Sequence, residues 1–246
     1  MSNLLRKLSA AMRSLRDMKI KTSIEPRASW RNRFLEVARG VCDNEERLFA
    51  SYPDARVTAM ARQTAISMSR LMRQLSSAGP GRTETRDRGM ADNLDFLLDV
   101  LHPGRKVIVW AHNSHIQHRG FGGDSTGVAE RMRTMGTWVA ERRRHELYTI
   151  GLYMYRGGAA NNARKVYRVR DAAPGSLEAI LHRAPWRYTF VDLSRATPEP
   201  GSAWMTRPVV VKEWGLNNVT IVPRAEYDGL LFIDTTWPPQ YVFRAR

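Results

Sequence analysis

Apolar side chains recur every three or four residues along the first hundred positions of the chain, which is the spacing of amphipathic helices. The pattern predicts helices over residues 29–50, 54–77 and about 85–101. A loop rich in Gly and Pro is expected at residues 76–82. The stretch 1–22 is basic and amphipathic, and we interpret it as a helix that packs its apolar stripe on the protein; a membrane-surface or targeting helix is the alternative.

Beyond residue 101 the pattern changes to short apolar runs rich in β-branched residues, which predict strands separated by helices. The run at residues 107–110 is continuously apolar, which is typical of a strand covered on both faces in a parallel sheet. A Gly-rich loop is expected at residues 120–127. The other expected strands lie at residues 147–155, 166–169, 188–192, 209–211 and 229–233, and the other helices at residues 128–141 and 176–181, with Ser176 as N-cap.

These elements predict an α/β fold with a mostly parallel sheet flanked by helices and a helical first third packed beside it. We divide the chain into a basic amphipathic segment, residues 1–28, and one domain, residues 29–246. The domain is expected to be helical over residues 29–101 and α/β over residues 102–246, because the change of pattern falls between them.

Composition indicates a globular protein, since 43% of the 246 residues are hydrophobic and seven are Trp. The single cysteine, Cys42, excludes an internal disulfide framework and a cysteine-rich zinc site, and it fits a reducing compartment. No apolar run approaches the ~20 residues that a membrane-spanning helix needs. The first twenty residues lack the apolar core of a secretory signal. We therefore expect a cytoplasmic protein without a transmembrane segment.

The chain is strongly basic, with a net charge of +15 and a pI of about 10.7. Such a charge permits binding to nucleic acid or to an anionic membrane. The charge comes mostly from arginines scattered along the chain, and no nucleic-acid-binding module accompanies them. We therefore interpret it as a basic solvated surface with no specific nucleic-acid partner, and association with a membrane or nucleic acid stays the alternative.

Candidate chemistry is concentrated in His112-Asn113-Ser114-His115, directly after the apolar run at residues 107–110. Ligands of parallel α/β sheets collect at the carboxyl ends of strands, and histidine titrates near neutral pH. A metal site would need further ligands, and a nucleophilic serine would need a Gly-x-Ser-x-Gly turn. General acid–base catalysis needs only that His112 and His115 face one cleft. No metal or other cofactor is expected.

Four motifs in the same order resemble the erythromycin esterase family. The first is the Trp-Ala-His-Asn-x-His block that contains His112 and His115, and the second is an Arg-Asp-x-x-Met-Ala-x-Asn helix start. The other two are a helix-then-strand step and a late Asp-Gly-Leu-Leu-Phe-Ile-Asp strand. In this chain the motifs occupy residues 110–115, residues 86–93, Met135-Gly136 with residues 148–151, and residues 227–234.

The resemblance implies an ester hydrolase that opens the lactone of a macrolide-like substrate, as in antibiotic resistance. In that family water attacks directly, without a metal, in a cleft lined by histidines, a glutamate and an arginine. By resemblance His112 and His115 are the catalytic residues. Arg86 and Asp87 would clamp the cleft against a small-molecule ester or tie their helix to the sheet, and Asn113 would contact the substrate.

One part of the family pattern is missing. The amino-terminal half of the family carries a first catalytic histidine in a Gly-Glu-x-x-His-Gly-like block, and a catalytic glutamate. The first histidine here is His102, in a Leu-His-Pro-Gly turn. The chain therefore resembles the carboxyl-terminal portion of an incomplete copy of the family fold, and a cleft-bearing binding protein without activity is the alternative function. His118 matches no family position, and Asp192 and Asp234, which end apolar runs, are interpreted as turn caps outside the catalytic set.

Overall fold

The computed structural model describes residues 54–76, 80–122, 131–195 and 199–241, with scattered helical positions between residues 32 and 50. The contacts divide the chain into two compact units, residues 1–109 and residues 110–246. The expected amphipathic segment 1–28 lies outside the described residues, as does most of the expected helix 29–50. Among the helices that the structure describes, none combines the length and the apolar character that crossing a membrane requires.

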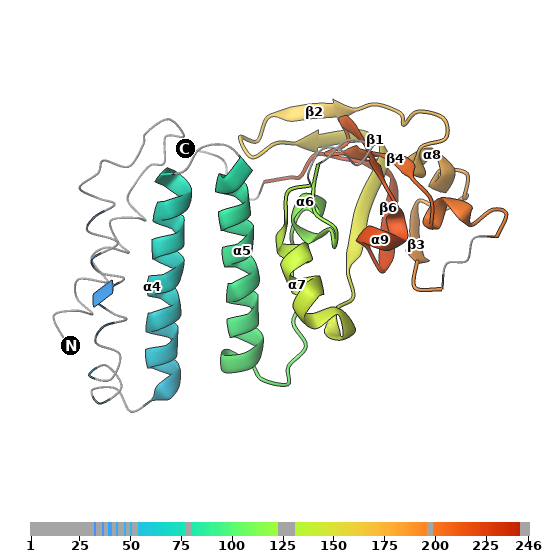
Figure 1. The fold of residues 1–246 in the computed structure, drawn as a ribbon. Helices are drawn as coiled ribbons and strands as arrows, with labels where there is room; N and C mark the ends of the chain where they lie inside the picture. The colour runs from blue at the N-terminus through green and yellow to red at the C-terminus, as the bar shows by residue number, and fades with distance from the viewer. Residues whose placement is uncertain are drawn as a thin grey trace. The chain divides into compact units, whose positions relative to one another are not determined.

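The first unit contains two long antiparallel helices, α4 (Ala55–Ser76) and α5 (Pro80–Phe96) (Figure 1). A π-helical turn, η1 (Leu97–Leu101), follows α5. Asn93 of α5 accepts hydrogen bonds from Gln63 at 2.7 Å and from Ser67 at 2.9 Å, so polar side chains join the two helices. Helix α5 begins at Pro80, earlier than expected, because the fixed φ of proline suits the first turn of a helix.

The second unit contains a four-stranded sheet in the order β2-β1-β6-β3 and a separate two-stranded sheet. Strands β1 and β6 are parallel, whereas β1–β2, β3–β6 and β4–β5 are antiparallel. The expected α/β class is confirmed, but the sheet is mixed rather than mostly parallel. The strands are β1 (Ile150–Ala160), β2 (Val166–Val169), β3 (Tyr188–Asp192), β4 (Val209–Glu213), β5 (Asn217–Ile221) and β6 (Gly229–Thr236).

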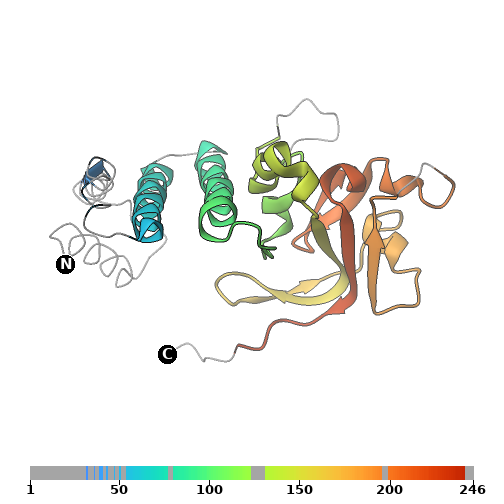
Figure 2. The same cartoon turned by 90° about the horizontal axis from the view of Figure 1, so that it is seen from below.

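Short helices accompany this sheet. Helices α6 and α7 lie side by side in both views, and they are on the opposite side of β1 from α8 and β3 (Figures 1 and 2). Helix α7 begins only after Thr134, because the Thr134 and Thr137 side chains cap each other's backbone N–H groups. Ser176 caps α8 as expected. The helical segments are α6 (Asn113–Ile116), α7 (Met135–Arg143), η2 (Arg144–Glu146), α8 (Leu177–Leu181), η3 (Ala203–Met205) and α9 (Pro223–Glu226).

The core of the second unit lies between the larger sheet, α8 and the β4–β5 hairpin. Tyr153, Phe232 and Leu177 are fully buried in it. Two of the sequence motifs meet here: Gly151 lies so close to Tyr227 that a Cβ on it would stand 3.0 Å from the ring. These motif residues therefore set the spacing of β1 against the end of α9, which is a packing role.

The prediction of a strand at residues 107–110 is wrong. Residues 105–112 are described and belong to no helix or strand, and 94% of Ile108 and 87% of Trp110 is exposed. A strand needs a hydrogen-bonded neighbour, and none of the pairings among the described strands includes this run. The apolar run indicated β propensity correctly, but propensity alone does not provide a partner.

Candidate functional site

His112 stands at the amino end of the four-residue helix α6 and is its N-cap. Its extended backbone, with φ −69° and ψ 150°, turns the imidazole back over the first turn. There Nδ1 accepts the backbone N–H of Ser114 at 3.2 Å and lies 2.9 Å from the Ser114 hydroxyl oxygen. The N–H of His115 donates to the carbonyl of His112 at 2.9 Å, so one turn of chain brings the two histidines together.

This capping contact determines the tautomer of His112. A backbone N–H can only donate, so Nδ1 must accept, and the proton of the neutral ring lies on Nε2. Desolvation by the surrounding protein, followed by the proximity of His115, lowers the pKa of His112 below its ordinary value. His112 is therefore a neutral Nε2–H donor at physiological pH.

Asn113 attaches this turn to the edge of β1. Its side-chain nitrogen donates to the carbonyl of Leu152 at 2.8 Å, and its side-chain oxygen accepts the N–H of Leu152 at 3.0 Å. The amide thus imitates the paired hydrogen bonds of a neighbouring strand, and only 8% of Asn113 is exposed. Asn113 positions the two histidines on β1, and its expected contact with substrate stays a prediction.

The Trp214 ring lies beside the His112 ring, and the sequence did not predict this contact. The Trp214 ring centroid lies 5.4 Å from that of His112 and 6.1 Å from that of Phe121. Trp214 has a φ of 55°, in the left-handed region that bulky residues avoid, and Tyr167 donates to its carbonyl at 3.0 Å. Gly215 follows at φ 70° in the same turn between β4 and β5, and this turn places the indole beside the imidazole.

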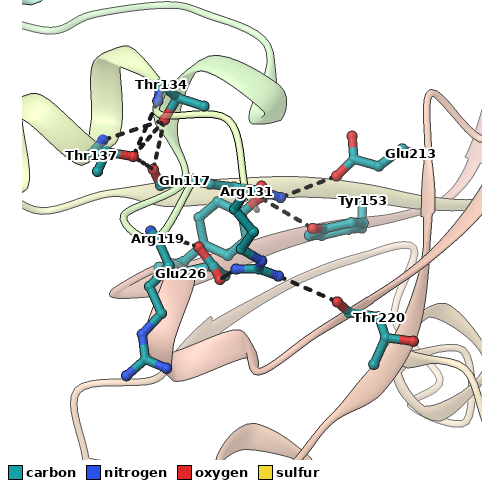
Figure 3. A network of polar contacts seen from close by, with 10 residues as sticks. Gln117, Arg119, Arg131, Thr134, Thr137, Tyr153, Glu213, Thr220 and Glu226 are labelled. Carbon is teal, nitrogen blue, oxygen red and sulfur yellow. Dashed lines mark hydrogen bonds and ion pairs between the residues drawn. The ribbon is translucent and has the colours of Figure 1, made fainter. Parts of the chain in front are cut away.

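A buried polar network holds the carboxyl end of α6 in place, and Gln117 lies at its centre (Figure 3). The Gln117 side-chain nitrogen donates to Glu213 Oε1 at 3.2 Å and to the hydroxyl of Tyr227 at 3.0 Å. The Gln117 carbonyl accepts the hydroxyl of Thr134 at 2.9 Å. Gln117 is 2% exposed, so this one side chain and its carbonyl link α6 to α7, to β4 and to the residues before β6. The network fixes the position of α6 in the second unit.

Two buried carboxylates lie behind this network. Glu213 is 1% exposed and Glu178 is fully buried. Burial, reinforced by the negative charge of Glu178, raises the pKa of Glu213 to about 7. Burial also raises the pKa of Glu178, although the backbone N–H of Lys212 donates to that carboxylate at 2.7 Å. The Glu213 carboxyl group, next to Trp214 in the sequence, therefore gains or loses its proton near neutral pH.

Gly136, in the third motif, has a steric role at the same place. A Cβ on Gly136 would stand 2.2 Å from the carbonyl carbon and oxygen of Ile116. Only a glycine lets α7 approach the end of α6 this closely. Since Gly136 follows directly on the capped start of α7, the motif holds α7 against the turn that carries the histidines.

The remaining expected site residues have different surroundings. Arg86 and Asp87 belong to the first unit, where Arg86 is exposed and Asp87 is fully buried. The helix begins six residues earlier than Arg86, which turns Asp87 into its packed face. His118 has a structural contact: its Nε2 lies 2.8 Å from the Thr149 hydroxyl oxygen. Within the described residues, no group of three or more His, Cys, Asp or Glu side chains could hold a metal ion.

Comparison with known proteins gives one family and a small set of relatives. The model of the erythromycin esterase family matches residues 2–236. The Bacillus subtilis (strain 168) protein YbfO, named a "putative hydrolase", is 32% identical over 156 residues, which are 62% of this chain and 35% of YbfO. This chain thus spans about a third of that relative's length.

Two solved structures share the fold. A Bacillus cereus protein superposes with a TM-score of 0.73 at 18% identity, over 96% of this chain and 59% of that protein. A succinoglycan biosynthesis protein superposes with a TM-score of 0.66 at 17% identity, over 95% of this chain and 58% of its own. At these identities the likeness extends to the fold alone.

Proposed function

The chain belongs to the erythromycin esterase family, and from that premise we propose that it hydrolyses carboxylic esters or lactones at His112 and His115. The observation that carries the proposal is the capping contact of His112, which leaves a neutral ring with its proton on Nε2. A neutral imidazole of this kind donates a hydrogen bond to a carbonyl without itself losing the proton. The name of the relative YbfO supports hydrolase chemistry.

The two histidines would have different roles, one as the oxyanion donor and the other as the general base. His112 Nε2–H would donate to the ester carbonyl oxygen and stabilise the negative charge that develops on it. His115 would take a proton from water while the water oxygen bonds to the carbonyl carbon. The C–O bond then breaks, the leaving alkoxide receives the proton from His115, and an alcohol and a carboxylic acid result; the acid releases its proton to solvent. No covalent intermediate with the protein is required.

The environment of the pair suits this division. Desolvation and the nearby His115 keep His112 uncharged, although the residue as a whole is exposed, and the Trp214 ring lies beside the imidazole. The Asn113 anchor and the Gln117 network hold the turn in place, so the donor does not have to reorganise during the reaction.

We extend the proposal to a bulky substrate of the macrolide class, on the strength of the family. Arg86 is the proposed substrate contact in the first unit, since it is exposed and its guanidinium can bind an ester or hydroxyl oxygen. Asp87 is buried in the same turn, and we propose that it holds this turn of the helix within the first unit.

The test is a hydrolysis screen with 4-nitrophenyl esters, simple lactones and a macrolide. His112→Ala is expected to lower kcat/KM by about 10²–10³, as loss of an oxyanion donor does. His115→Ala should lower it by about 10²–10⁴, as loss of a general base does. His145→Ala is the matched control, because His145 is 81% exposed at its side chain and lies in η2. Equal rates in all variants would contradict the proposal, and thermal stabilisation by a macrolide without turnover would support a binding protein instead.

A further inference from the structure

A second histidine with an oriented ring lies elsewhere in the same unit, and its residues are not shared with the site of His112 and His115. His182 follows α8 directly, and its Nδ1 is hydrogen-bonded to Asp234 Oδ1. The hydroxyl of Thr235 donates to the other carboxylate oxygen, Asp234 Oδ2, at 3.0 Å. Asp234 was interpreted from the sequence as a turn cap, but the structure gives it a histidine partner 52 residues away.

Tyr155 fixes the plane of the His182 ring. The two ring centroids are 3.9 Å apart and the ring planes differ by 6°, which is a stacked arrangement. The carbonyl of Tyr155 accepts the side-chain amine of Lys212 at 2.8 Å, so the strand that carries the ring is itself anchored. The imidazole therefore has a hydrogen bond in its plane and an aromatic face against it, which together leave it a single orientation.

Asp234 lies near the carboxyl end of a parallel strand. Tyr155 and Asp234 are on the parallel strands β1 and β6, between the paired positions Met154–Ile233 and Arg156–Thr235; Tyr155 is at the middle of β1, and Asp234 is two residues before the end of β6. That edge of a parallel strand pair is the usual place for bound small molecules.

The carboxylate and the imidazole have complementary protonation. Partial burial by itself raises the pKa of Asp234, but the hydrogen bonds from His182 and Thr235 outweigh it, and the pKa lies below its ordinary value. The positive charge of Arg156 acts in the same direction. An ionised Asp234 accepts Nδ1–H of His182, which leaves the lone pair on Nε2. The side chain of His182 is 38% exposed, and the hydrogen bonds among the described residues engage only its Nδ1.

We propose that His182 and Asp234 form a second acid–base centre that hydrolyses small carboxylic esters near the carboxyl end of β6. His182 Nε2 takes a proton from water, and the water oxygen bonds to the ester carbonyl carbon. The tetrahedral intermediate expels the alkoxide, which takes the proton from His182. Asp234 is a positioning residue: it holds the ring tautomer and stabilises the imidazolium that forms between the two steps.

The test uses the full chain with 4-nitrophenyl acetate. His182→Gln and Asp234→Asn are each made in the His112→Ala variant, so that hydrolysis at His112 does not mask the second centre, and each is expected to lower the remaining kcat/KM by about 10²-fold or more. His145→Gln is the control, since His145 is also 3.3 Å from a carboxylate, that of Glu146, but has no stacked ring, and its rate should stay within about twofold. Circular dichroism and thermal unfolding like those of the parent would show that Asp234→Asn is folded.

A second readout does not depend on turnover. Diethyl pyrocarbonate acylates neutral imidazole, and mass spectrometry gives the rate at each histidine. His182 should react several-fold faster than His145, and Asp234→Asn should remove the difference, because the tautomer is then no longer held. Equal reactivity of the two histidines, or hydrolysis by the His112→Ala/His182→Gln double variant as fast as by His112→Ala, would overturn the inference. Hydrolysis that depends on His112 but not on His182 would overturn this inference alone, and dependence on His182 alone would overturn only the proposed function.

Discussion

Glu213→Gln tests the buried carboxylate behind the candidate site. The parent side chain is 1% exposed and Oε1 accepts one hydrogen bond, from Gln117 at 3.2 Å. Among the described residues, Oε2 of Glu213 has no hydrogen-bond partner. Burial, and then the charge of Glu178, raises the pKa from 4.5 to about 7. Glutamine has nearly the same shape and cannot ionise, so the substitution removes the titration and little else.

The magnitude follows from proton linkage. The pKa of Glu213 is raised on folding by 7 − 4.5, or about 2.5 pH units, and each unit corresponds to about 1.36 kcal/mol. A group whose folded pKa is raised contributes stability that is fully present below the unfolded pKa and is lost as the pH rises through the folded pKa. The parent should therefore lose about 2–3 kcal/mol of unfolding free energy from this group between pH 5 and pH 8. Glu213→Gln should lose none of it.

Urea unfolding followed by tryptophan fluorescence at pH 5, 6, 7 and 8 measures the difference. Relative to the parent, Glu213→Gln should gain stability steadily toward pH 8. Glu141→Gln is the matched control, because its carboxylate is 55% exposed and pairs with Arg133 at the surface; its pH profile should follow the parent's. Parallel profiles for the parent and Glu213→Gln would refute the assignment of a raised pKa to Glu213.

Three further substitutions test the support of the candidate site. Gly136→Ala should lower stability by about 1–3 kcal/mol in thermal unfolding, because the added Cβ would overlap the backbone of α6. Gly81→Ala is the control and should not destabilise, since a Cβ there has nothing within 4 Å. Equal melting temperatures for the two variants would contradict the packing role of Gly136. Asn113→Ala should cost about 1–3 kcal/mol and speed hydrogen exchange at the Leu152 amide, and unchanged exchange there would be the contrary result. Trp214→Gly should relieve about 1 kcal/mol or more of left-handed strain yet lower kcat/KM for esters, and unchanged kcat/KM would contradict a role at the site.

Local patterns predicted those elements whose stability is local. The helical spacing of apolar residues identified α4, and Ser176 identified the start of α8, because side-chain capping is a contact of neighbours in sequence. β2 and β3 were predicted with their observed bounds. The run at residues 107–110 was misinterpreted because a strand depends on a hydrogen-bonded partner, which no local pattern contains.

The candidate site shows the same division. His112 and His115 could be found from the sequence because they stand three residues apart in one motif. Trp214 could not, since its contact with His112 spans about a hundred residues and depends on a left-handed turn after β4. His182 and Asp234 are likewise separated by 52 positions and meet only because α8 packs against β1, which is the neighbour of β6 in the sheet. The positive φ of a bulky residue is a signal that appears only in three dimensions.

The most direct measurement is kcat/KM for one hydrolysable ester as a function of pH, in the parent and in His112→Ala. Because desolvation and His115 lower the pKa of His112, the parent should keep its full oxyanion donor down to pH values below 6.5. His112→Ala should lose about 10²-fold or more of kcat/KM at every pH. A variant that hydrolyses the ester as fast as the parent across the whole pH range would contradict a catalytic site at His112.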